Sequence, residues 1–326
     1  MDVFWYALVG LLLAGYLALE SLDFGTGLLF LTVREERDRE RLRRGVVPLF
    51  LANEVWLVAF TGLLLGALPG LESGLLHGLR SYLLVLLTAW FLRDAALWFR
   101  TAHPGDRWRR GWDAVLPAAS LVLAAGWGLV LATLIRGLST DGRGQAVGTL
   151  GDALHPLALL CAALTVVASL RQGALHACRA QPDGAVRHRL TRLARRLAVA
   201  LAPLVLLAAV LGGLDGGDLP ATAVLGALAA ACVYVSERAA AAGMFGRALV
   251  WGTVPLLALP VTVGLVHGTT VLATRSGVGA VALADAVANS ASLTLLTVTV
   301  LPALVAVALG QVWMWRVFGG TGRPPS

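Results

Sequence analysis

Apolar residues fill most of the chain in long runs that are separated by short polar connections. Nine runs can be drawn, and most of them reach the ~20 residues that a helix needs to cross a bilayer. They cover residues 3–32, 46–69, 77–99, 113–136, 153–178, 197–213, 219–236, 246–273 and 289–318. The pattern predicts an all-α integral membrane protein with about nine transmembrane helices. Because no connection is long enough for a soluble domain, we expect residues 1–326 to form a single polytopic transmembrane domain.

Arginine is distributed unevenly among the connections. The connections after odd-numbered runs are rich in Arg, with dense clusters at Arg34–Arg44 and Arg179–Arg196, and the tail carries Arg316 and Arg323. The connections after even-numbered runs hold few basic residues or none. Positively charged connections stay on the cytoplasmic side of a membrane. The sequence therefore predicts an outside N-terminus, a cytoplasmic C-terminus and an odd number of helices.

Composition agrees with a membrane protein and excludes several other classes. Hydrophobic residues make up 58% of the chain and charged residues 14%, whereas soluble proteins carry roughly 25% charged residues. The formal net charge of +7 comes from loop arginines that orient the helices, so it does not indicate nucleic-acid binding. Cys161, Cys178 and Cys232 are scattered, which argues against a disulfide framework or a structural zinc site.

Two carboxylates inside the first apolar run are candidates for chemistry. Glu20 and Asp23 are three residues apart, so a helix would place them on one face. An ionised group at membrane depth costs at least ~2.5–3.5 kcal/mol, and such residues are usually functional. With the predicted orientation, both acids lie roughly 15–20 Å from the cytoplasmic edge, at ~1.5 Å per residue. The alternative is that these acids have no function and lie near a helix end, where they reach the polar lipid headgroups.

A second polar pair opens the next run. Asn53 and Glu54 lie in an otherwise apolar helix that would enter from the cytoplasmic side. Antiparallel neighbours joined by a short loop usually pack together, so we expect Glu54, Asp23 and Glu20 to form an acid ladder that could carry protons. The alternative, that Asn53 and Glu54 only join helices by hydrogen bonds, has equal weight.

Two arginines inside apolar runs are possible charge partners of these acids. Arg93 and Arg171 either extend to the membrane surface along their aliphatic stems or neutralise Glu20, Asp23 or Asp94. Arg171, next to Gln172, is the preferred partner because the sequence around it stays apolar. The six histidines fall mainly near predicted membrane edges, which favours interfacial roles. A heme held near the outer face by His77, His155 or His267 stays an open alternative.

At this point two segments resemble a known family. The segment GYLALESLDFGTGLL around Glu20 and the segment PLFLANEVWLV around Glu54 are similar to the first two helices of subunit II of cytochrome bd-type quinol oxidases (the CydB family). Weaker similarity follows in family order at FLRDAALWFR, RWRRGWDAVLP, SLRQGALHACR, NSASLTLLTV and WMWRVFGG. The order and the nine-helix count cover nearly the whole chain.

The resemblance implies a divergent, heme-free subunit of a respiratory oxidase in the bacterial cytoplasmic membrane. Its fold would be two four-helix bundles plus one peripheral helix. A larger subunit I would bind heme b, with or without heme d, and the complex would oxidise quinol and reduce dioxygen to water. This chain would bind no cofactor or metal itself, contribute routes for protons and dioxygen, and contact lipid and quinone. The presence of a small single-helix subunit stays open.

The resemblance assigns roles to particular positions and also departs at two of them. Trp56 matches a tryptophan near the apolar route of dioxygen, although packing is the commoner role of such a residue. The family's Trp-Asp pair in the second helix falls on Phe50 and Leu51, so that carboxylate, implicated in proton uptake, is missing. The family's Asp-Gly-Phe-Asp segment falls on residues 20–23, where the acids remain and the glycine is lost.

Two other functions remain alternatives on the sequence alone. One is a proton-coupled transporter that uses the acid ladder, although the two halves lack the matched Gly and Pro interruptions typical of transporters. The other is a purely structural oxidase subunit with no working proton path. No catalytic residue is expected in the chain itself, because nucleophile, triad and HExxH signatures are absent from the sequence.

Overall fold

Long helices make up nearly all of the protein. The computed structural model describes residues 2–33, 35–180 and 184–318, so Arg34 and Arg323 of the arginine pattern lie outside the described residues. The long helices are α1 (Asp2–Leu29), α2 (Glu36–Ala67), α4 (Arg80–Phe99), α5 (Asp106–Arg136), α7 (Pro156–Ala180), α8 (Ala185–Gly216), α9 (Leu219–Ala241), the pair α10 (Phe245–Gly252) and α11 (Val254–His267), and α13 (Ser290–Phe318). Counting α10 and α11 together, nine segments of the described chain are long and apolar enough to span a membrane. The predicted fold class is confirmed.

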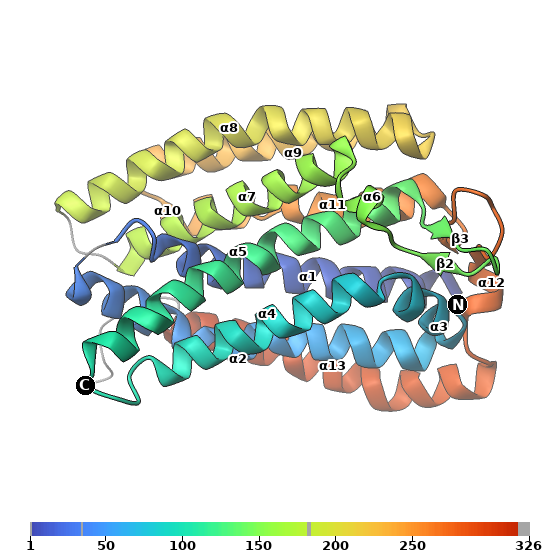
Figure 1. Cartoon of the computed structure of the whole chain (residues 1–326), viewed down its shortest axis with the longest axis horizontal. Helices are drawn as coiled ribbons and strands as arrows, with labels where there is room; N and C mark the ends of the chain where they lie inside the picture. The colour runs from blue at the N-terminus through green and yellow to red at the C-terminus, as the bar shows by residue number, and fades with distance from the viewer. Residues whose placement is uncertain (1, 34, 181–183, 319–326) are drawn as a thin grey trace.

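The helices run nearly parallel and define two ends of the molecule (Figure 1). We call one the arginine-rich end. The helices α1 and α4 end there, and α2, α5 and α8 begin there. The other is the hairpin end, which holds the short elements. These are α3 (Pro69–Gly78), α6 (Leu150–Ala153), α12 (Leu283–Ala286), β1 (Ser139–Thr140), β2 (Ala146–Val147), β3 (Thr270–Leu272) and β4 (Val281–Ala282). The N-terminus lies at the hairpin end and the C-terminus at the arginine-rich end.

Two antiparallel hairpins close the hairpin end. β1 pairs with β2 and β3 pairs with β4, and an isolated bridge between Leu138 and Thr274 connects the two hairpins. Asp152 stabilises this connection, because its buried carboxylate forms ion pairs with Arg275 and, at 3.6 Å, with Arg136. These strands were not predicted, because segments of two or three residues are too short to produce an alternating pattern.

The long helices form two bundles and a peripheral helix. The first bundle consists of α1, α2, α4 and α5, and the second of α7, α8, α9 and the α10–α11 pair. α1 and α5 of the first bundle pack against α7 and α11 of the second, and α13 lies on the outer side of α2. In the most apolar stretch of α5 and of α7, 61% of the residues are buried, compared with 6% in α13. α5 and α7 are therefore the central helices.

Glycines allow the two bundles to approach closely. A Cβ atom added at Gly25 of α1 would lie 1.8 Å from the carbonyl oxygen of Ser169 on α7, and one added at Gly173 would lie 2.3 Å from the backbone of Gly25. α1 is continuous through Gly25 and Gly27. Close approach, and not a bend, is therefore the reason for glycine at position 25.

Several helices differ from the predicted runs, and two of these differences have a clear physical cause. α2 begins at Glu36, ten residues before the apolar run, because Glu40 pairs with Arg43 at 2.9 Å and Arg44 at 2.8 Å, at the helical spacings i+3 and i+4. The run 246–273 forms α10 and α11 with a break at Thr253, where Pro255 cannot donate the hydrogen bond that would continue the helix. α11 ends at His267, and Gly268 follows with a positive φ of 56°.

Candidate functional site

A cluster of charged side chains is buried inside the first bundle, and we call it the acid cluster. It consists of Glu20 and Asp23 on α1, Glu54 on α2, and Arg93 and Asp94 on α4. Glu20 and Arg93 have no exposed surface, and Asp23 and Glu54 are 3% and 7% exposed. The three acids of α1 and α2 that the sequence singled out therefore meet in one place.

Arg93 is the centre of the acid cluster. Its Nη1 donates to Glu20 Oε2 at 2.5 Å, its Nε donates to Asp94 Oδ1 at 2.8 Å, and its Nη2 donates to Glu54 Oε1. The guanidinium lies 5.7 Å from the centre of the Phe24 ring. One cation thus connects three helices, while Glu20 Oε1 is buried without a hydrogen-bond partner among the described side chains.

Asp23 lies in the electrostatic field of Arg93, Glu54 and Asp94, but its hydrogen bond goes to a side-chain amide. Asn53 Nδ2 donates to Asp23 Oδ2 at 2.9 Å, and Gln311 Nε2 of α13 donates to Asn53 Oδ1 at 2.9 Å. Gln311 is a neighbour of the acid cluster that was not among the residues predicted from the sequence. A lone carboxamide in an otherwise apolar stretch was the signal that could have found it.

Arg171 does not join the acid cluster, so the preference for it as the partner of the α1 acids is wrong. Its Nη1 donates to Ser236 Oγ at 2.8 Å and its Nη2 lies 3.6 Å from Glu237 Oε2, both on α9. The side of α7 that faces α1 carries Ser169 and Gly173. A residue two positions from Ser169 points to the opposite side of a helix. Arg93, the other candidate, is the charge partner.

The neighbours on α2 point in different directions. Trp90 Nε1 donates to Glu54 Oε1 at 2.8 Å, which fixes that carboxylate from the α4 side. Trp56 packs against Gly15 of α1, where an added Cβ would lie 2.4 Å from its ring. Phe50 is buried, whereas Leu51 is 54% exposed. Leu51, which the resemblance aligns with a second-helix carboxylate, therefore faces the surface of this chain and lies outside the acid cluster.

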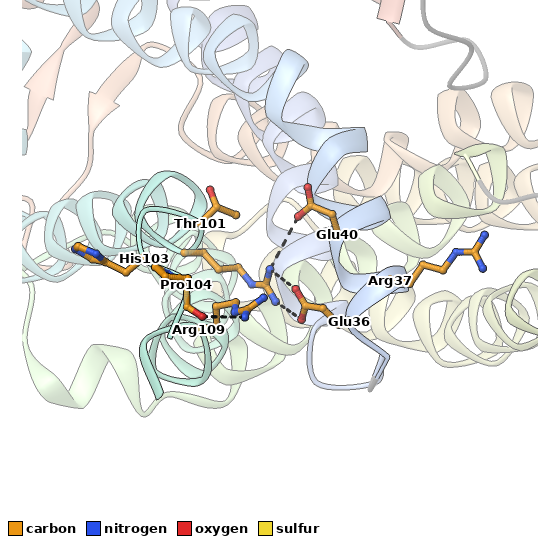
Figure 2. A pocket seen from close by; sticks show the side chains of 8 residues that line it. Glu36, Arg37, Glu40, Thr101, His103, Pro104 and Arg109 are labelled. Atoms are coloured by element: carbon orange, nitrogen blue, oxygen red, sulfur yellow. Dashed lines mark hydrogen bonds and ion pairs between the residues drawn. The ribbon is translucent and has the colours of Figure 1, made fainter. Parts of the chain in front are cut away.

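A hollow of about 560 Å³ opens at the arginine-rich end between α2 and the α4–α5 connection. In Figure 2, Glu36 and Glu40 approach it from α2 and Arg109 lies across from them, while Arg37 points away. Buried Arg100 contacts Glu36 at 2.7 Å and Asp113 at 2.6 Å. Burial opposes its charge, but these carboxylates more than offset that effect and raise the pKa of the Arg100 guanidinium.

An apolar layer separates this hollow from the acid cluster. Arg100 is seven residues from Arg93, roughly 10 Å along α4. Phe30, Phe50 and Leu97 are buried members of the apolar cluster in this part of the molecule. The hydroxyls of Thr26 on α1 and Ser120 on α5 are buried in the same part of the bundle, without hydrogen-bond partners among the described residues.

Three of the six histidines form separate contacts. His155 Nδ1 accepts from the amide of Leu157 and lies 3.6 Å from Asp215, and His267 Nε2 bonds the carbonyl of Leu134 at 2.7 Å. His176 is buried at the arginine-rich end, where its Nε2 lies 3.2 Å from the carbonyl of Gly45. Two facing ring nitrogens, as a bis-histidine heme requires, are not offered by these contacts. Within the described residues, no group of three or more His, Cys, Asp and Glu side chains is arranged to hold a metal ion.

Comparison with known proteins gives one consistent result. The family model described as cytochrome bd terminal oxidase subunit II matches residues 1–318. Cytochrome bd ubiquinol oxidase subunit 2 of Bacillus subtilis is 30% identical over 139 residues, which is 42% of this chain and 41% of that protein. Cytochrome bd-I ubiquinol oxidase subunit 2 of Escherichia coli is 26% identical over 178 residues, which is 53% of this chain and 47% of that protein.

These alignments span less than half the length of the two relatives. A chain of the bd oxidase from Geobacillus thermodenitrificans is similar in structure, with a TM-score of 0.78, 19% identity, and coverage of 97% of this chain and 98% of that one. At that identity the likeness shows the fold.

Proposed function

Because the chain belongs to the cytochrome bd terminal oxidase subunit II family, we propose that it is the heme-free second subunit of a quinol:dioxygen oxidoreductase. The chain is a single polytopic domain of a bacterial cytoplasmic membrane, with its N-terminus outside and its arginine-rich end in the cytoplasm. The alternation of arginine along the sequence supports this orientation.

The acid cluster is the single feature that supports a role in proton supply. Glu20, Asp23, Glu54 and Asp94 place four carboxyl groups around one guanidinium, that of Arg93. With one cation for four acids, full ionisation would leave an uncompensated negative charge at membrane depth, which is costly. Such a cluster stores and exchanges protons, and dioxygen reduction consumes protons. In this proposal Glu20, Asp23 and Glu54 are the proton carriers, and Asn53 positions Asp23.

The other components of the reaction belong to a larger partner subunit. In the proposed complex that subunit binds heme b, with or without heme d, and oxidises quinol, and the hemes supply the chemistry of dioxygen reduction there. The separate contacts of His155, His176 and His267 support this division, since they are not arranged as axial ligands. Trp56, set against Gly15, is the candidate for a residue along the dioxygen route.

Purification in mild detergent tests the complex itself. We expect a larger membrane subunit with b-type or d-type heme absorbance to co-purify with this chain. A lone, colourless chain that binds a solute would instead support a proton-coupled carrier.

Replacing Glu54 by Gln tests the proton role. The change keeps shape and hydrogen bonding but removes a titratable group, so we expect quinol-driven oxygen consumption and proton uptake to fall together by roughly 10²-fold, the low end for a positioned proton donor. The matched control is Glu72→Gln on α3, a carboxyl group at the hairpin end. Unchanged turnover and proton uptake, in a complex that retains its hemes, would remove Glu54 from the path.

A purely structural role has its own supporting observation. Arg93 uses Nε, Nη1 and Nη2 on three carboxylates, which also serves to hold α1, α2 and α4 together. On that alternative Glu54→Gln would lower the yield of assembled complex and leave turnover per heme unchanged. The oxygen-consumption measurement, normalised to heme, therefore separates the two.

A further inference from the structure

The first turns of α8 carry a row of exposed arginines at the arginine-rich end. Residues 184–200 contain five arginines and no acid, and the nearest acid in the sequence, Asp183, lies outside the described residues. Four of these arginines are exposed and form no ion pair with another described residue; they are Arg189, Arg192, Arg195 and Arg196. The described part of the protein therefore leaves four cations of one helix without a counter-charge.

The other dense arginine cluster, at the start of α2, is largely neutralised by its own acids. Residues 35–44 contain five arginines and four acids. Glu40 pairs with Arg43 at 2.9 Å and with Arg44 at 2.8 Å. Both clusters lie at the same end, and either one supplies the positive charge that orients a membrane protein. Orientation alone therefore does not explain why the α8 cluster lacks acids.

The neighbouring helix α9 does not balance the row either. Its sequence holds one acid, Glu237, whose carboxylate lies 3.6 Å from the buried guanidinium of Arg171 on α7. The next residue, Arg238, is exposed and adds positive charge at the same end. The surface formed by the first turns of α8 and the last turns of α9 is therefore strongly basic.

The four arginines lie on the side of α8 that faces away from the protein. The buried side of the helix carries Leu190, Ala194, Ala198, Leu201 and Val205. Beyond the arginines, the large exposed side chains of α8 are apolar; they are Val199, Leu206, Leu207, Val210 and Leu214. Arg192, Arg196, Val199, Leu206 and Val210 follow one another at spacings of three, four or seven residues, which places them in one row on a helix. The arginine row is therefore a continuation of the apolar row that faces the lipid chains.

The length of α8 sets the depth of the arginines. At ~1.5 Å per residue, residues 197–216 span ~30 Å, the thickness of the hydrocarbon core of a bilayer. The polar layer extends roughly 5–7 Å beyond that core. Arg195 and Arg196 lie at the boundary and Arg192 lies one turn further, so they are level with the phosphate groups. α8 runs along one edge of the molecule (Figure 1), where lipid can reach both rows.

We propose that Arg189, Arg192, Arg195 and Arg196 form a binding site for anionic phospholipid. The phosphate groups lie on the arginine row, and the acyl chains lie along the apolar row of α8. Guanidinium groups bind phosphate with two parallel hydrogen bonds, and a basic cluster directly beside a transmembrane segment is typical of anionic-lipid recognition. A free phosphate would use only the arginines, whereas a phospholipid uses both rows, so their continuity favours the lipid. The site is independent of the proposed role in proton supply.

Native mass spectrometry of the purified full chain in a neutral detergent tests the site. Phosphatidylglycerol is titrated into the chain and compared with phosphatidylcholine of the same acyl chains, whose headgroup has no net charge. We expect phosphatidylglycerol to bind more tightly. The double variant Arg192→Gln with Arg196→Gln should lower its affinity by roughly 25-fold, about fivefold for each arginine removed, and leave phosphatidylcholine unchanged. Because both side chains are exposed, we expect the thermal unfolding temperature to stay at its wild-type value.

The matched control is the double variant Arg43→Gln with Arg44→Gln at the start of α2. It removes the same charge from the same end of the molecule, but from a cluster that contains its own acids, so we expect a loss of less than about threefold. Equal losses in the two double variants would show attraction to net charge alone and would overturn the proposed site.

Three other outcomes would also contradict the lipid site. One is phosphatidylcholine binding as tightly as phosphatidylglycerol. Another is displacement of phosphatidylglycerol by low concentrations of inorganic phosphate, which would indicate a site for a free anion. The third is wild-type lipid binding in the α8 double variant together with loss of a co-purifying subunit, which would show that the row binds a protein. None of these measurements needs turnover, so failure of the Glu54→Gln prediction is a separate result.

Discussion

At the residue scale, the identity of the central cation is the main point that sequence could not decide. The convergence of Glu20, Asp23 and Glu54 follows from helical spacing and from the packing of consecutive antiparallel helices, and it could be predicted. Arg93 and Arg171 both lie inside apolar runs, and only the rotation of α4 and α7 about their axes decides which one faces the acids. Rotation depends on packing of side chains from distant segments, such as Gly25 against Ser169.

Replacing Arg93 by Met should destabilise the protein strongly. The change leaves Glu20, Glu54 and Asp94 without their shared cation in a buried site, and breaking a buried ion pair from one side costs about 3–5 kcal/mol. We expect the free energy of unfolding, measured by titration with a denaturing detergent, to fall by about that amount. Arg80→Met, at an exposed position of the same helix, is the control. Equal unfolding midpoints for both variants would contradict a central role of Arg93.

At the element scale, hydrophobic runs located the helices but not their interruptions. Most of the runs coincide with one long helix, because a helix that crosses a membrane needs about 20 mainly apolar residues, but the run 246–273 forms α10, α11 and β3. The extension of α2 into the arginine-rich connection and the break at Thr253 depend on local charge pairs and on proline. The hairpins β1–β2 and β3–β4 have too few residues to produce an alternating pattern. These features are therefore visible only in the structure.

The contact between α1 and α7 makes a prediction at this scale. Gly25→Ala would place a methyl group 1.8 Å from the Ser169 carbonyl, so the two bundles would have to move apart, and overpacking of this kind costs about 1–3 kcal/mol. Gly10→Ala is matched, because it lies on the same helix with nothing within 4 Å of the added atom. It should be neutral or stabilising by up to about 1 kcal/mol. Thermal unfolding in detergent compares the two, and equal losses would count against the close contact.

At the scale of the whole molecule, the two bundles carry a buried ion pair at corresponding places with opposite charge. The first helix of the first bundle holds Glu20 and its third helix holds Arg93, whereas α7 holds Arg171 and α9, the third helix of the second bundle, holds Glu237. The two pairs differ in the distance between their charged atoms, which is 2.5 Å for Glu20 and Arg93 and 3.6 Å for Arg171 and Glu237. Glu237 is also partly exposed. Among the described residues, an excess of carboxyl groups surrounds the first pair and not the second, which is why proton exchange is proposed for the first bundle.

The direction of proton movement depends on the orientation of the whole chain in the membrane, and this can be measured directly. Gly142→Cys at the hairpin end and Ala102→Cys at the arginine-rich end are both exposed positions, in a chain whose Cys161 and Cys178 are buried. If arginine sets the orientation, a membrane-impermeant maleimide should label Gly142→Cys in intact spheroplasts and Ala102→Cys only after lysis. The wild-type chain gives the background. Labelling of Ala102→Cys from outside would show the opposite orientation, with the arginine-rich end facing away from the cytoplasm that must supply the protons in the proposed function.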